Sequence, residues 1–152
     1  IEDAMRAIDE AVKLQETEVL NATEAAERIV LNYKADDKRI SGFGHRFHQA
    51  DPRTARLFEL AKELKIAGKY VEQAEVLEKV LSEKSGKSLP INADGAIAAL
   101  LCEMDFPPKI ANGIFMIART AGLVAHAVEE QENHPPMRTV DVDNYEFEGT
   151  EK

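Results

Sequence analysis

The sequence contains a single cysteine, Cys102, among its 152 residues. One cysteine excludes a disulfide within the chain, and nothing indicates an oxidising compartment, so we expect a cytoplasmic protein. Cys102 ends the apolar run 96–102 and is expected to be a small buried residue rather than a nucleophile. No apolar run approaches the roughly 18 residues of a membrane-spanning helix, and no secretory signal is visible, so no membrane partner is predicted.

The chain also lacks a basic stripe. Its formal net charge is −9, from 19 Lys and Arg against 28 Asp and Glu, which argues against a nucleic-acid partner. Three histidines, His48, His126 and His134, have no metal-ligand spacing with cysteines or acids, so no metal site is predicted. The Gly-Lys-Ser triplet at 86–88 lacks the earlier glycine of a phosphate-binding loop, and we interpret it as a solvated turn.

Helical periodicity is the main structural signal, and neither an internal repeat nor a clear strand pattern accompanies it. Apolar residues recur at helical spacing from Ile1 to Val12 and from Ala25 to Val30, the second stretch after a cap at Asn21 or Thr23. Further helices are predicted over 53–66, 69–82, 95–104 and 109–131. Because 44% of the residues are hydrophobic, a folded, all-α protein is expected.

The last predicted helix contains two glycines, Gly113 and Gly122. Each costs about 1 kcal/mol relative to Ala inside a helix. We therefore expect close packing against another helix or a ligand at these positions.

Two segments place chemically useful side chains on loops between predicted helices. The first is Gly-Phe-Gly-His-Arg at 42–46 with Asp-Pro-Arg at 51–53, and the second is Pro-Ile-Asn-Ala-Asp-Gly at 90–95. Removing a proton beside a carbonyl requires a carboxylate base and an electrophilic partner for the developing oxyanion, roles that suit Asp94 and His45. Arg46 and Arg53 would suit an anionic substrate, because a guanidinium matches a carboxylate.

Each of these residues also has a structural interpretation. His45 could be a turn residue of a glycine-rich loop, and Asp94 could cap the helix that begins near Gly95. Arg53, which follows a proline, could lie in a solvated first helical turn. The spacing alone leaves both interpretations open.

Several motifs together resemble a known family. They are 42–46 with 51–53, Ile-Asn-Ala-Asp-Gly-Ala-Ile at 91–97, Asn-Gly-Ile-Phe at 112–115, Ile-Ala-Arg-Thr-Ala-Gly at 117–122, and Met-Arg at 137–138. In this order they resemble the carboxyl-terminal half of the citrate synthase superfamily, from about Ile1 to Arg138. The segments 92–97 and 112–115 look more like citryl-CoA lyases, and the citryl-CoA lyase module of ATP-citrate lyase, than like typical citrate synthases.

The resemblance implies a role for each site residue. His45 would hydrogen-bond the oxaloacetate carbonyl, and Asp94 would take a proton from the acetyl-CoA methyl group or return it during cleavage. Arg53 and Arg119 would hold substrate carboxylates, and Arg138 would reach into the site of a partner subunit. The coenzyme A side would be served by Gly42, Gly44 and Arg46.

The implied fold is a citrate synthase-like helical fragment, with the small mobile domain at 1–94 and the last helices of the large domain at 95–152. Closure of the two parts would exclude water from the reaction. The implied enzyme is a homodimer or higher oligomer that binds no permanent cofactor. It would interconvert citryl-CoA with acetyl-CoA and oxaloacetate, and the alternatives are a citrate or 2-methylcitrate synthase and a noncatalytic helical assembly module.

One family feature falls outside this sequence. The family has a further catalytic histidine in a His-Gly-Gly-Ala-like motif, expected just upstream of Ile1, where it would steady the enol oxygen of acetyl-CoA. The resemblance therefore implies that the 152 residues alone carry an incomplete site and would have little activity.

Overall fold

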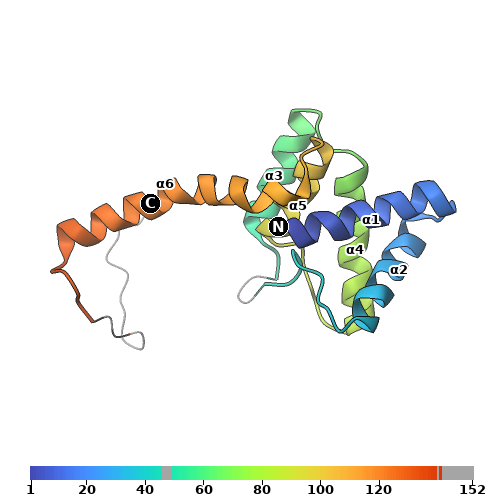
Figure 1. The fold of residues 1–152 in the computed structure, drawn as a ribbon, viewed down its shortest axis with the longest axis horizontal. Coiled ribbons are helices and arrows are strands. Elements are labelled where there is room, and N and C mark those ends of the chain that lie inside the picture. The colour runs from blue at the N-terminus through green and yellow to red at the C-terminus, as the bar shows by residue number, and fades with distance from the viewer. Residues whose placement is uncertain (46–48, 140, 142–152) are drawn as a thin grey trace. The chain divides into compact units, whose positions relative to one another are not determined.

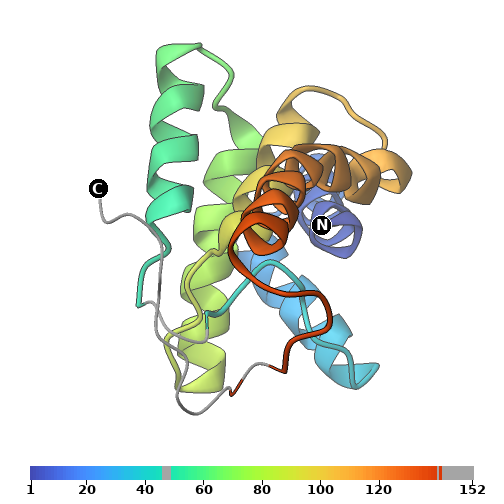
Figure 2. The ribbon, with the colours of Figure 1, turned by 90° about the vertical axis from the view of Figure 1, so that its left-hand side faces the viewer.

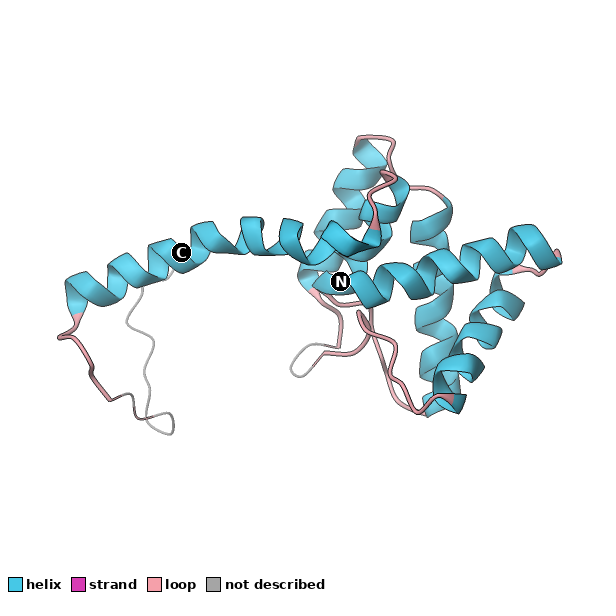
Figure 3. Ribbon diagram, viewed as in Figure 1, coloured by secondary structure: helices cyan, strands magenta, loops and turns pink. Residues whose placement is uncertain are grey.

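The structure is a computed structural model that describes residues 1–45, 49–139 and 141. These residues form helices and connecting loops without a strand, apart from one isolated bridge between Phe43 and Ile91 (Figure 3). The elements are α1 (Glu2–Glu18), α2 (Ala22–Ala35), α3 (Pro52–Glu63), α4 (Lys69–Ser85), α5 (Ala93–Glu103), the short 3₁₀ helix η1 (Pro108–Ile110) and α6 (Ala111–Asn133). The all-α prediction is confirmed.

The start of α2 shows why the helices begin where the sequence predicts. The side chain of Asn21 accepts hydrogen bonds from the backbone N–H groups of Thr23 and Glu24, and the Glu24 carboxylate accepts one from the backbone of Asn21. This reciprocal pair satisfies N–H groups that have no partner within the helix. Of the two predicted caps, Asn21 is therefore the one that is used.

Four helices build the core of the first compact unit, Ile1–Phe115. Helix α1 packs against α2, α4 and α5, and α4 also packs against α2 and α5 (Figures 1 and 2). The buried positions of α1 recur every three or four residues and form one apolar face: Ala4, Met5, Ala7, Ile8, Ala11 and Val12. Helix α5 is apolar on nearly every side because it lies among three other helices of this unit.

The second compact unit, Met116–Lys152, contains most of α6. Large apolar side chains of this helix are exposed to solvent: Met116, Ile117, Leu123, Val124 and Val128. At Gly113 and Gly122 the described residues provide no close packing against another helix, since beyond the immediate neighbours and the nearby backbone of α6 none of their atoms lies within 4 Å of a Cβ built there. Packing against a ligand at these positions stays a prediction. A helix that is apolar on most sides is normally covered, so α6 presents an unusual surface.

The stretch Pro108–Asn133 also meets a test for membrane-spanning helices. Its most apolar 18 residues have a mean hydropathy of 1.2, and 6% of that window is buried. The sequence-based expectation that no stretch reaches this length and composition is therefore wrong, because an average over the window tolerates Arg119 where an unbroken apolar run does not. Core helices pass the same test, so the finding alone does not indicate a membrane protein.

The predicted domain boundary near Asp94 falls inside the first compact unit. Helix α5, which carries Asp94, packs against α1, α3 and α4 in that unit. The boundary between the two compact units lies instead after Phe115. The predicted boundary at Asp94 separates two domains that would move relative to each other in a whole enzyme. That division stays a prediction.

One contact between helices leads to a stability prediction. The carboxylate of Glu103, the last residue of α5, accepts hydrogen bonds from the backbone N–H groups of Gly68, Tyr70 and Val71 at 2.8, 2.9 and 3.0 Å. It thereby caps α4, whose own cap residue, Gly68, has no side chain to do so.

Glu103→Ala is expected to lower the free energy of unfolding by about 1–3 kcal/mol, because it leaves several N–H groups of α4 without an acceptor. Urea denaturation followed by circular dichroism would measure the change. Glu83→Ala is the matched control, since Glu83 is an exposed acid near the other end of α4, the helix that Glu103 caps. Equal stability of the two variants would contradict the capping role.

Candidate active site

The site begins with a pairing of two loop segments. The backbone N–H of Gly44 donates to the carbonyl of Pro90 at 2.7 Å, and the N–H of Asn92 donates to the carbonyl of Gly42 at 3.0 Å. The side chain of Asn92 adds a third bond, from Nδ2 to the carbonyl of Gly44 at 2.9 Å. These bonds hold the loop that carries His45 against the start of α5.

Gly42 and Gly95 allow the two segments to touch backbone to backbone. Gly42 has φ +91°, a conformation that favours glycine, and a Cβ added there would lie 2.8 Å from the Cα of Gly95. A Cβ added at Gly95 would lie 2.2 Å from the carbonyl oxygen of Gly42. The structure thus gives Gly42 a packing role, and the predicted contribution of Gly42 and Gly44 to coenzyme A binding stays a prediction.

Asn92 rather than Asp94 caps α5. The Oδ1 atom of Asn92 accepts from the backbone N–H groups of Asp94 and Gly95 at 3.0 and 3.2 Å. The structural interpretation of Asp94 as the helix cap is therefore wrong. Asp94 is the second residue of α5, so its side chain is carried on the first turn of the helix.

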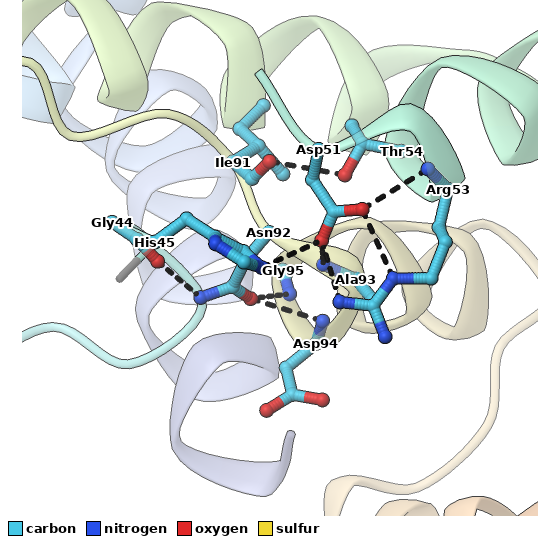
Figure 4. Close-up of polar contacts among 10 residues, drawn as sticks. All are labelled: Gly44, His45, Asp51, Arg53, Thr54, Ile91, Asn92, Ala93, Asp94 and Gly95. Atoms are coloured by element: carbon cyan, nitrogen blue, oxygen red, sulfur yellow. Dashed lines mark hydrogen bonds and ion pairs between the residues drawn. The ribbon is translucent and has the colours of Figure 1, made fainter. Parts of the chain in front are cut away.

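The carboxylate of Asp94 has no hydrogen bond or ion pair with any described residue, and it points away from the neighbouring polar groups (Figure 4). The side chain is half-buried. An acid–base group needs an accessible carboxylate held on a rigid element, and Asp94 meets both conditions.

Asp51, for which the sequence predicted no role, accepts four hydrogen bonds within the site. Its side chain is fully buried, and it accepts hydrogen bonds from Nε and Nη2 of Arg53 at 3.0 and 2.8 Å. It also accepts from the backbone N–H groups of Arg53 and Ala93, each at 3.0 Å. The Asp-Pro order at 51–52 could have indicated a helix cap, because acidic caps followed by proline commonly begin helices.

The predicted catalytic histidine lies beside this cluster. His45 Nε2 is 3.9 Å from Asp51 Oδ2, close enough for a charge interaction but too far for a hydrogen bond (Figure 4). His45, Arg53 and Asp94 thus lie near one another at the start of α5 (Figure 4), and their catalytic and binding roles stay predictions. Arg53 is held by Asp51, yet 62% of its side chain is exposed and can meet a ligand.

The electrostatics of the cluster are dominated by the Asp51–Arg53 pair. The hydrogen bonds from the Arg53 side chain hold the pKa of Asp51 well below its usual range, and the backbone N–H groups of Arg53 and Ala93 add to the effect. The pKa of Arg53 is raised, chiefly by its hydrogen bond to Asp51 and to a smaller extent by the charge of Asp94. Both groups are therefore ionised at neutral pH.

Acid should weaken the fold through Asp51. Because its pKa is lower in the folded than in the unfolded chain, its contribution to stability is present above about pH 4 and is lost as the pH falls further. The wild-type free energy of unfolding should therefore fall more steeply between about pH 5 and pH 2 than that of Asp51→Asn. Urea denaturation at several pH values measures this, and parallel curves would contradict it.

The remaining predicted residues lie elsewhere. Arg46 falls outside the described residues. Arg119 and Arg138 belong to the second compact unit, whose placement relative to the first is not determined. Within that unit Arg138 forms a two-pronged ion pair with Glu130, with Nη2 2.7 Å from Oε2. The binding roles of the three arginines stay predictions.

Cys102 is buried, as predicted, and burial raises the pKa of its thiol to about 12. A thiol with this pKa is almost entirely protonated at neutral pH and is a poor nucleophile. Among the described residues, no group of three or more histidine, cysteine, aspartate or glutamate side chains could hold a metal ion.

Comparison with known proteins identifies the family. Residues 2–139 match the model of the citrate synthase C-terminal domain. The chain therefore belongs to the citrate synthase family.

Individual relatives span several activities. The structure resembles that of citryl-CoA lyase from Hydrogenobacter thermophilus, with 37% sequence identity, a TM-score of 0.77, and coverage of 99% of this chain and 57% of that one. It is 39% identical over 101 residues to a citrate synthase of Synechocystis sp., which covers 63% of this chain and 25% of the relative. It is 33% identical over 120 residues to 2-methylcitrate synthase of Shewanella oneidensis, which covers 76% of this chain and 32% of the relative.

The chain thus spans between a quarter and a third of these two curated relatives, and just over half of the citryl-CoA lyase chain. The comparisons establish the fold and the family of this chain. The activity, substrates and partners of a whole enzyme are proposals.

Proposed function

We propose that this chain contributes to a citryl-CoA lyase, which cleaves citryl-CoA into acetyl-CoA and oxaloacetate. The observation that supports this choice is the similarity to the Hydrogenobacter thermophilus citryl-CoA lyase over 99% of the chain. The proposal includes a coenzyme A thioester as substrate, no permanently bound cofactor, and no nucleic-acid or membrane partner. The proposed location is the cytoplasm.

The arrangement of the site supports the chemistry. During cleavage the tertiary hydroxyl of the citryl group would pass its proton to His45 as the carbonyl of oxaloacetate forms and the carbon–carbon bond breaks. His45 would hydrogen-bond the oxygen at which this carbonyl forms. Asp94, whose side chain has no partner among the described residues, would enter this step as the carboxylic acid, give its proton to the carbon of the departing acetyl-CoA enolate and be left as the carboxylate.

The arginines would hold the carboxylates of the substrate. Arg53 is suited to this because Asp51 fixes its guanidinium while most of the side chain stays exposed. Arg119 would bind a second carboxylate, and Gly42, Gly44 and Arg46 would serve the coenzyme A side. In the synthetic direction the same groups would act in reverse, and Asp94 would remove the methyl proton of acetyl-CoA.

We also propose that the complete protein is a homodimer or higher oligomer. The exposed apolar side chains of α6 support this, since a second copy that covered them would remove them from water. Arg138 would then enter the partner's site, after exchanging its pair with Glu130 for a substrate carboxylate. Light scattering should give a mass that is a multiple of the chain mass, and a monomer would contradict this part of the proposal.

Assays with two substrate sets test the function. The complete protein is given citryl-CoA, and oxaloacetate release is followed through its reduction by malate dehydrogenase and NADH. In parallel it is given oxaloacetate with acetyl-CoA or propionyl-CoA, and release of the free thiol is followed. Faster cleavage of citryl-CoA supports the lyase, whereas rapid thiol release without citryl-CoA cleavage would identify a citrate or 2-methylcitrate synthase.

A further inference from the structure

We propose that Asp51 is a positioning residue, which fixes the substrate-binding Arg53 relative to the base Asp94. The inference rests on the proposed function for the roles of Arg53 and Asp94. Asp51 is a buried carboxylate whose hydrogen bonds go to Arg53 and to the start of α5.

The two oxygens of Asp51 are fully used by contacts within the protein. Oδ1 accepts from the backbone N–H and from Nε of Arg53, and Oδ2 accepts from Nη2 of Arg53 and from the backbone N–H of Ala93. An ionised carboxylate offers about four acceptor sites, and here four donors occupy them. With its side chain fully buried and its pKa lowered, Asp51 acts through its neighbours and not as an acid or base.

The first neighbour is Arg53. Two of its side-chain donors are bound to Asp51, so the plane of the guanidinium is fixed while the rest of its edge faces outward. An arginine that is already held loses less conformational freedom when it binds a carboxylate. Asp51 therefore prepares Arg53 for substrate binding.

The second neighbour is the start of α5. The oxygen that binds Nη2 of Arg53 also accepts the N–H of Ala93, the residue directly before Asp94 (Figure 4). The Oδ2 atom of Asp51 thus joins Arg53 to the backbone next to Asp94. His45 Nε2 lies 3.9 Å from the same oxygen, so the carboxylate's charge also faces the histidine.

The test replaces Asp51 by Asn in the complete protein. The amide keeps one acceptor oxygen but turns an NH₂ group toward donors, so at least one of the bonds to Arg53 or Ala93 must be lost. We expect faster hydrogen exchange at the N–H of Ala93, and a fall in oxaloacetate affinity by calorimetry on the order of tenfold, the worth of one charge-assisted hydrogen bond. Unchanged exchange at Ala93 together with unchanged oxaloacetate affinity would overturn the inference.

A double-mutant cycle separates positioning from general destabilisation. If Asp51 acts through Arg53, Asp51→Asn should weaken oxaloacetate binding in the wild-type background but have little further effect in Arg53→Ala. If Asp51→Asn weakened oxaloacetate binding equally in the wild-type and Arg53→Ala backgrounds, the positioning role would be contradicted. Glu103→Ala is the matched control, because it also removes a carboxylate from a helix N-terminus and should leave oxaloacetate affinity unchanged.

The outcomes also separate this inference from the proposed function. If the wild-type protein binds no oxaloacetate, the proposed function fails, and hydrogen exchange at Ala93 still decides whether Asp51 holds the start of α5. If the wild type binds oxaloacetate and Asp51→Asn binds it equally well, the proposed function stands and the positioning role fails.

Discussion

Asp94→Asn is expected to lower the turnover of the complete enzyme by a factor of about 10²–10⁴, the usual contribution of a positioned acid–base group. The variant has nearly the same shape but cannot exchange a proton at neutral pH. Its folding should be almost unaffected, because the wild-type carboxylate makes no hydrogen bond or ion pair with any described residue. Steady-state kinetics with citryl-CoA, together with urea denaturation, would measure both properties.

The stability change expected for Asp94→Asn is small and has one identifiable cause. A negative charge in the first turn of a helix stabilises it by about 0.3–1 kcal/mol, and the amide removes that charge. Glu72→Gln is the matched control, since Glu72 is an exposed acid in the first turn of α4. It should lose similar stability and keep full turnover.

The result also distinguishes an enzyme from a noncatalytic helical module. A module retained for assembly or regulation would not depend on the acid–base group of Asp94. Unchanged turnover in folded Asp94→Asn would therefore support the module, and a large loss would exclude it.

Gly95→Ala is expected to destabilise the first compact unit by about 3 kcal/mol or more, at the upper end of overpacking effects. The new Cβ would lie 2.2 Å from the carbonyl oxygen of Gly42 and 3.0 Å from Cγ2 of Ile91. The carbonyl cannot easily withdraw, because it accepts the hydrogen bond from the N–H of Asn92. The loop and the helix must therefore separate, which would also move His45 away from Asp94.

Thermal and urea denaturation of Gly95→Ala would measure the loss. Gly113→Ala is the matched control within the same unit, since beyond the immediate neighbours and the nearby helix backbone no described atom lies within 4 Å of a Cβ at that position. There the better helix propensity of Ala should add up to about 1 kcal/mol. If Gly95→Ala were as stable as this control, the close approach of Gly42 and Gly95 would not constrain the fold.

The helices were predictable because their signals are local. Asn21, Gly68 and the apolar period of α1 each specify a helix start or a buried face within a few residues of sequence. The exposure of α6 was not predictable in the same way. Its apolar composition indicates a helix that needs cover, but composition alone does not say whether the described chain provides it.

The sequence by itself determined the all-α class, most helix limits, the burial of Cys102, and the motif order that identifies the family. It also indicated His45, Arg53 and Asp94 as a candidate site, because their residue types suit acid–base chemistry on an anion, and their roles stay predictions. These properties depend on local periodicity and on the order of motifs along the chain.

Only the tertiary structure decided how that site is held. The hydrogen bond between Asp51 and Ala93 joins two residues that are 42 positions apart in the sequence. Gly42 and Gly95, and likewise Glu103 and the start of α4, meet only when the helices pack. Contacts between such distant segments depend on the three-dimensional path of the whole chain. Neither propensity nor spacing could therefore have predicted the bond of Asp51 to Ala93, that of Asn92 to Gly44, or the cap that Glu103 places on α4.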